Sequence, residues 1–198
     1  MSMANGGLPK VRKTLASYFT GPVVRLLART PVTPSAITWF GFLVSLAAAL
    51  LVATGHLLIA GVVVVVAGIF DMLDGALARS TNRVTRFGAV LDSTLDRLAE
   101  GALLLGIMFL YASDGQVTEV LIAGIVLLGS LMVSYIRARA EAIGIECTVG
   151  LFTRPERVVL LALGLLLNQL LIALLVVAVL SWLTVGQRLV YVWRRTKG

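Results

Sequence analysis

Long apolar segments, separated by short polar ones, fill most of this chain from Ala36 onward and constrain its fold more than any other feature. A run of about 20 apolar residues suits a helix that crosses the hydrocarbon core of a membrane. The chain has 198 residues, of which 59% are hydrophobic and only 14% are charged. This composition excludes an ordinary soluble domain. The sequence therefore predicts an all-α, polytopic membrane protein.

Polar and turn-forming residues divide the apolar region into six predicted transmembrane helices. We expect them at 36–53, 57–78, 87–111, 117–143, from Pro155 to a turn at Asn168 and Gln169, and from that turn to about Trp193. Ser35, which follows Pro34, is the predicted N-cap of the first.

We expect one domain over residues 1–198, with a six-helix bundle at 36–193. A basic and apolar segment at 8–30 precedes it and suits an amphipathic helix in the membrane interface. A basic flank that only orients the first span explains residues 8–30 equally well.

The basic residues predict the orientation in the membrane. The connections after the first, third and fifth predicted spans contain no Lys or Arg, whereas all 17 basic residues lie in the termini, in the other two connections or at the helix ends beside them. Because basic residues stay on the cytoplasmic side, both termini should face the cytoplasm of a cell membrane. The net charge of +7 is then explained by topology and by contact with anionic lipids or a phosphorylated substrate, and not by nucleic acid.

An aspartate-rich segment, DMLDGALARSTNRVTRFGAVLDSTLD at residues 71–96, joins the second and third predicted spans. It holds four of the ten acidic residues of the chain, namely Asp71, Asp74, Asp92 and Asp96. Each carboxylate in a membrane segment costs about 2.5–3.5 kcal/mol, which disfavours a purely structural role. Asp71 and Asp74 share one helix face, as do Asp92 and Asp96, so two antiparallel helices can direct both pairs at one point.

Four carboxylates without a nearby His or Cys form a hard-oxygen site. Such a site favours Mg²⁺, Mn²⁺ or Ca²⁺ over zinc. Two divalent ions about 3.5–4 Å apart are typical of displacement reactions at phosphorus. Gly75 and Gly88 leave space for a ligand near the backbone, and Arg79 offers a forked donor to a phosphate.

Other interpretations stay open from these residues alone. The acids could be solvated interface residues or partners of the nearby arginines, and the glycines could serve helix packing. A chain of membrane acids could also form the proton or cation relay of a transporter. Against the relay, the acids are confined to the cytoplasmic half, and the first, fifth and sixth spans offer almost no polar continuation.

The pattern of residues 71–96 resembles the signature of the CDP-alcohol phosphotransferase family at every fixed position: aspartate at 71, 74, 92 and 96, glycine at 75 and 88, alanine at 78 and arginine at 79. The resemblance implies a homodimeric membrane enzyme of phospholipid biosynthesis that displaces CMP from CDP-diacylglycerol by attack of an alcohol. It implies that the four aspartates hold two divalent ions, Mg²⁺ or Mn²⁺, in each subunit, and that Asp96 is also the general base.

The same resemblance implies contacts with the CDP moiety at Gly75, Ala78, Arg79 and Gly88. The family often has Pro-Asn before the first span, where this chain has Pro34-Ser35 followed by Thr38. A nucleotide contact from Thr38 is a further expectation, although this corner departs from the family pattern.

A second basic set suits a phosphorylated acceptor. The segments SYIRARAEA and RPER resemble those of prokaryotic family members that make phosphatidylinositol phosphate, and this resemblance implies that Arg137, Arg154 and Arg188 hold the phosphate of inositol phosphate. For each arginine alone, anchoring of the topology is an equal alternative. Glycerol 3-phosphate is the alternative acceptor.

Overall fold

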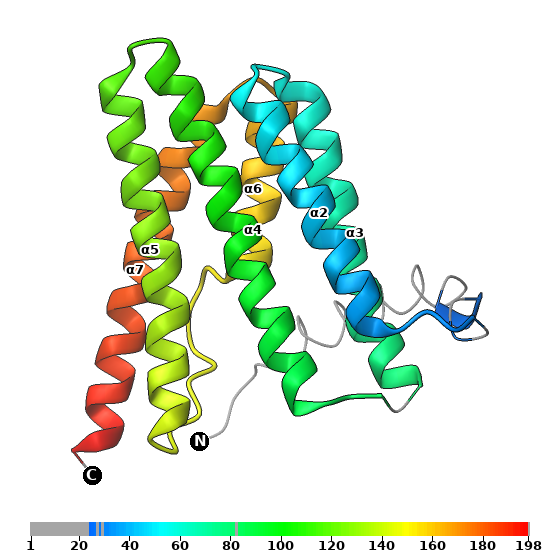
Figure 1. Ribbon diagram of the computed structural model, residues 1–198. Helices are drawn as coiled ribbons and strands as arrows, with labels where there is room; N and C mark the ends of the chain where they lie inside the picture. Colours follow the sequence, from blue (N-terminus) through cyan, green and yellow to red (C-terminus); the bar gives the residue numbers. More distant parts are fainter. Residues whose placement is uncertain (1–23, 27, 29, 82, 198) are drawn as a thin grey trace. The chain divides into compact units, whose positions relative to one another are not determined.

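The computed structural model describes residues 24–26, 28, 30–81 and 83–197. Over this part of the chain the fold is all-helical (Figure 1), as the sequence predicts. The long helices are α2 (Pro34–Ala53), α3 (Leu57–Ser80), α4 (Arg86–Ser113), α5 (Val117–Ala142), α6 (Arg154–Leu166) and α7 (Leu170–Thr196). They occupy the six predicted segments, with ends that differ by at most three residues. Most of the amphipathic helix expected at 8–30 lies outside the described residues.

Four of these helices, α2, α3, α5 and α7, are long and apolar enough to cross a membrane. Helix α4 has 28 residues, but its first half carries several charged side chains. Helix α6 has 13 residues, which at 1.5 Å per residue span about 20 Å, less than the roughly 30 Å of a hydrocarbon core. The structure therefore supports an integral membrane protein, and the arrangement with six spans stays a prediction.

Helix α2 begins two residues earlier than predicted, because Thr33 and not Ser35 is its N-cap. The hydroxyl of Thr33 accepts a hydrogen bond of 3.3 Å from the Ala36 N–H. Pro34 then occupies the first helical position, where its fixed φ and missing N–H carry no cost. The predicted cap at Ser35 is wrong, since that residue already lies within the helix.

The turn predicted at Asn168 and Gln169 is confirmed. Asn168 has a φ of 53°, a left-handed conformation that asparagine tolerates better than most side chains. The N–H of Gln169 reaches back to the Gly164 carbonyl at 2.8 Å and closes the end of α6. A polar pair within an apolar run thus marks the boundary between α6 and α7.

The described residues form two compact units. The aspartate unit comprises the described residues up to Leu43 together with Val66–Asp96, and the arginine unit comprises Val44–Val65 and the residues from Arg97 onward. A small apolar core holds the aspartate unit together, formed by Val24, Ile37, Leu73 and Leu77. The arginine unit has a larger core, and in it α7 packs along α5 and α6 (Figure 1).

Candidate active site

Three of the four predicted metal ligands lie close together in the aspartate unit. Asp71 comes from the second half of α3, and Asp92 and Asp96 come from the first turns of α4. Each offers a carboxylate oxygen, and these oxygens lie within 4.8 Å of one another. The three side chains are half-buried. Because like charges repel strongly away from bulk water, such a group suits a bound cation, and its oxygen donors suit Mg²⁺ or Mn²⁺.

The fourth predicted ligand, Asp74, lies outside that group but in the same unit. Its side chain is only 4% exposed. One carboxylate oxygen accepts the N–H of Gly75, while the other, Oδ2, is buried without a hydrogen-bond partner among the described residues. Leaving a buried carboxylate oxygen unsatisfied is costly. Oδ2 of Asp74 therefore also fits a site that binds a cation.

The residues predicted to contact the CDP moiety continue the acidic face of α3. Gly75 and Ala78 follow Asp71 by four and seven positions, so they share its face of the helix. The guanidinium of Arg79 lies over Gly75, since a Cβ added at Gly75 would stand 3.2 Å from Arg79 Nη1. A larger residue at position 75 would have to displace this guanidinium.

The other two predicted contacts lie at helix starts of the aspartate unit. The N–H of Gly88 donates to the hydroxyl of Thr85 at 2.9 Å, which satisfies one of the free donors at the start of α4. Thr38, in the second turn of α2, donates its hydroxyl to the Pro34 carbonyl at 3.1 Å. Each of these residues thus has a local structural role, and their contacts with CDP stay predictions.

The three predicted acceptor arginines belong to the arginine unit and differ in their surroundings. Arg137, near the end of α5, is exposed and pairs with Glu141 at 2.8 Å. Arg154 is the first residue of α6 and is half-buried. Arg188, in α7, is only 3% exposed.

Arg188 donates to two main-chain carbonyls, from Nε to Val149 at 2.9 Å and from Nη1 to Val133. A guanidinium has five N–H donors, so these two bonds leave capacity for an anion.

A buried ion pair in the arginine unit was not predicted. Arg157, one turn after Arg154, donates Nε and Nη2 to the two carboxylate oxygens of Glu100 at 2.6 and 2.8 Å. The side chains are 1% and 4% exposed. An acid in a largely apolar segment, such as Glu100, normally requires a basic partner. Its position in the sequence could therefore have predicted a buried ion pair, although not the identity of the partner. The pair joins α4 to the start of α6.

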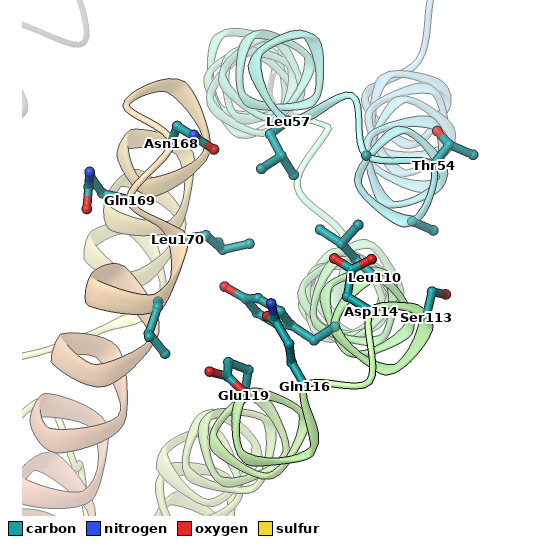
Figure 2. A pocket seen from close by; sticks show the side chains of 14 residues that line it. Thr54, Leu57, Leu110, Ser113, Asp114, Gln116, Glu119, Asn168, Gln169 and Leu170 are labelled. Atoms are coloured by element: carbon teal, nitrogen blue, oxygen red, sulfur yellow. The ribbon is translucent and has the colours of Figure 1, made fainter.

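The arginine unit also has a cavity of about 800 Å³, at the end away from the predicted acceptor arginines (Figure 2). It is lined by the turns that join α2 to α3, α4 to α5 and α6 to α7, and Thr54, Asp114 and Glu119 contribute polar groups. Its lining includes no arginine, lysine or predicted site residue. Arg137, Arg154 and Arg188 lie toward the opposite ends of their helices. Within the arginine unit, this cavity is therefore separate from the three predicted acceptor arginines.

The membrane helices, the carboxylates that suit divalent cations and the arginines that suit phosphate define the class as an integral membrane enzyme. The chain belongs to the CDP-alcohol phosphatidyltransferase family, whose model matches residues 31–190. The predicted family is thus confirmed.

Two relatives align with nearly the whole chain. The archaetidylinositol phosphate synthase of Methanothermobacter thermautotrophicus is 39% identical over 201 residues, which cover 96% of this chain and 100% of the relative. The phosphatidylinositol phosphate synthase of Mycobacteroides abscessus is 41% identical over 187 residues, which cover 90% of this chain and 84% of the relative.

Solved structures of the Mycobacterium tuberculosis phosphatidylinositol phosphate synthase have the same fold. The structure of that protein with CDP-DAG bound matches with a TM-score of 0.81 at 38% identity, over 88% of this chain and 93% of the other. Its complex with manganese and citrate matches with a TM-score of 0.80, over 88% of both chains.

Proposed function

We propose that the protein transfers a phosphatidyl group from CDP-diacylglycerol to inositol phosphate, with release of CMP and formation of phosphatidylinositol phosphate. The observation that carries this proposal is the group of carboxylates from Asp71, Asp92 and Asp96, whose oxygens converge within 4.8 Å. The family match supplies the reaction type. Both relatives described above are named as synthases of a lipid that carries inositol phosphate, archaetidylinositol phosphate in one and phosphatidylinositol phosphate in the other.

The aspartates hold the cations in this proposal. Asp71, Asp74, Asp92 and Asp96 together bind two divalent ions, Mg²⁺ or Mn²⁺, with the buried Oδ2 of Asp74 as one ligand atom. Such ions, when bound, neutralise a pyrophosphate and polarise the phosphorus under attack. Manganese in the structure of the M. tuberculosis relative supports this choice of cation.

Asp96 also acts as the general base. A carboxylate oxygen of Asp96 takes the proton of the acceptor hydroxyl as the acceptor oxygen forms a bond to the lipid phosphorus. The bond from that phosphorus to the CMP oxygen breaks, and CMP leaves with the electron pair. The acidic face of α3 contributes to donor binding through Gly75, Ala78 and Arg79, and Thr38 and Gly88 contribute from α2 and α4.

Arg137, Arg154 and Arg188 bind the phosphate of the acceptor. Arg154 is the strongest of the three candidates, because it stands at the first position of α6, where the helix dipole also favours an anion. Arg137 can exchange its surface partner Glu141 for a phosphate at little cost, since exposed ion pairs contribute only about 0–1 kcal/mol.

The organisation in the membrane is part of the proposal. It comprises a single domain over residues 1–198 with six spans, an interfacial helix at 8–30 and both termini on the cytoplasmic side of the cell membrane. It also comprises a homodimer. The four apolar helices and the basic residues support the topology.

A competition assay tests the acceptor. Purified protein is given CDP-diacylglycerol with inositol phosphate, free inositol, glycerol 3-phosphate and serine, and the lipid products are separated. Inositol phosphate should be preferred, because a neutral acceptor forfeits the charge-assisted hydrogen bonds of the arginines. Preference for glycerol 3-phosphate would overturn the inositol assignment and leave the family assignment intact. Preference for serine or free inositol would overturn the arginine site itself.

A further inference from the structure

The backbone segment 149–152, which leads into α6, is held by side chains of α7. The N–H of Phe152 donates to the hydroxyl of Thr184 at 3.2 Å. The N–H of Leu151 donates to Oε1 of Gln187, also at 3.2 Å. Thr184 and Gln187 are three residues apart, so they lie on one face of α7. Side chains of a helix therefore satisfy main-chain donors of a segment more than 30 residues away in sequence.

The same face of α7 holds this segment at a third point. Nε of Arg188 donates to the Val149 carbonyl at 2.9 Å. Between these contacts, Gly150 has a φ of 135°, and a Cβ at this position would meet Thr184 Cγ2 at 2.7 Å. Only glycine allows the backbone both this conformation and this close approach to α7. The conformation of residues 149–152 is thus fixed by contacts from one side.

The segment ends at the arginine assigned to the acceptor phosphate. Phe152 is followed by Thr153, the N-cap of α6, whose N–H donates to Glu156 Oε2 at 2.9 Å in a capping box. Arg154 is the next residue. No flexible linker separates the contacts at residues 151 and 152 from Arg154, so a shift of this backbone shifts the guanidinium and the start of α6 together.

Two polar side chains on this face of α7 bond to the segment and not only within their own helix. Thr184 already satisfies its own hydroxyl by donating to the Leu180 carbonyl at 2.8 Å. The side chain of Gln187 is exposed, yet its oxygen accepts from the main chain of the segment. An exposed residue contributes little to a core, whereas a hydrogen bond to the segment that carries Arg154 can set the position of that arginine.

We propose that Thr184 and Gln187 are positioning residues for acceptor binding: they hold residues 151 and 152 so that Arg154 meets the acceptor phosphate. This inference rests on the proposed function of Arg154. It predicts that loss of either contact raises the KM for the acceptor and leaves kcat and the KM for CDP-diacylglycerol nearly unchanged.

The test uses steady-state kinetics of the full-length protein with inositol phosphate as the varied substrate. Gln187→Leu removes the accepting oxygen at an exposed position, and the acceptor KM should rise by about 3- to 10-fold, the effect of one hydrogen bond. Gln187→Glu keeps an accepting oxygen and should stay near the wild-type KM. Gln116→Leu, an exposed glutamine before α5, is the matched control and should also leave the KM unchanged. Thr184→Val, which removes the accepting hydroxyl, should raise the acceptor KM in the same way. Thr184→Ser, which keeps the hydroxyl, should stay near the wild-type KM.

A double-mutant cycle separates positioning from a general structural effect. If Gln187 acts through Arg154, Gln187→Leu should add no further rise in acceptor KM to Arg154→Ala. If Gln187→Leu raises the acceptor KM by the same factor in Arg154→Ala as in the wild type, the inference is overturned. An unchanged acceptor KM for Gln187→Leu and Thr184→Val, when Arg154→Ala alone raises it, also overturns the inference. If Arg154→Ala itself leaves the acceptor KM unchanged, the proposed function of Arg154 fails, which is a separate result.

Discussion

The aspartate unit and the arginine unit hold their charged side chains in opposite ways. In the aspartate unit, three carboxylates of like charge converge within 4.8 Å, and a fourth has a buried oxygen without a partner among the described residues. In the arginine unit, Arg157 is paired with Glu100 and Arg188 is bonded to two main-chain carbonyls. The first arrangement favours binding of a cation, while the second also stabilises the fold. Substitutions should therefore affect catalysis in the first unit and both stability and acceptor binding in the second.

The largest effect is expected at Asp96 in the aspartate unit. Asp96→Asn removes the general base and should lower kcat by about 10²- to 10⁴-fold. Binding of CDP-diacylglycerol should be largely retained, because three carboxylates still hold cation. Asp71→Asn should lose donor binding as well. Equal losses of binding in the two variants, measured by titration with the CDP-lipid, would show that these roles are wrongly assigned.

In the arginine unit, loss of one partner of the buried ion pair should destabilise the fold. Glu100→Ala leaves the charge of Arg157 buried and should lower the free energy of unfolding in detergent by about 3–5 kcal/mol. Glu141→Ala, which breaks the exposed pair with Arg137, is the control and should cost about 0–1 kcal/mol. Similar losses in both variants would contradict the contrast between a buried and an exposed pair.

The acceptor arginines should show smaller effects, and these should differ with burial. Arg154→Ala should raise the KM for inositol phosphate by about 10- to 100-fold, the loss of one charge-assisted hydrogen bond. Arg188→Ala should raise it too and also lower stability, since two main-chain carbonyls lose their donor. The change for Arg137→Ala should be the smallest. Steady-state kinetics gives the KM for each of the two substrates. A rise in the KM for CDP-diacylglycerol as large as that for inositol phosphate would contradict an acceptor role.

The smallest effect concerns the start of α2 in the aspartate unit. Thr33→Ala removes the N-cap and should lower the free energy of unfolding by about 1 kcal/mol. Ser35→Ala should change it by less than about 0.5 kcal/mol, because position 35 lies within the helix. If Ser35 were the cap, the unfolding curves would show a larger loss of stability for Ser35→Ala than for Thr33→Ala.

Most of the helical plan could be predicted from the sequence. Apolar runs bounded by turn residues placed all six long helices, including the turn at Asn168. The N-cap of α2 was missed because Thr33 and Ser35 are both good caps that flank Pro34. Proline prefers the first helical position, which makes the residue before Pro34 the N-cap. Thr33 could therefore have been predicted as the cap from the sequence.

The two parts of the site differed in how well they could be predicted. The aspartates could be found because their spacing of three and four residues is local to a helix and their motif is specific. The partners of the arginines could not, since Glu100 and Arg157 are 57 residues apart and Arg188 bonds to main-chain carbonyls. Main-chain partners leave no pattern in the side chains. The contacts that hold Arg188 could therefore not be predicted from the sequence.

The most direct test of the central claim, that the aspartate unit is a catalytic site for divalent cations, is metal-dependent release of CMP. Purified protein is incubated with CDP-diacylglycerol and inositol phosphate in excess chelator, and Mn²⁺ or Mg²⁺ is then restored. CMP release should be absent in chelator and should return with either cation, because four carboxylates and a pyrophosphate repel one another without it. Full CMP release in excess chelator would contradict the claim.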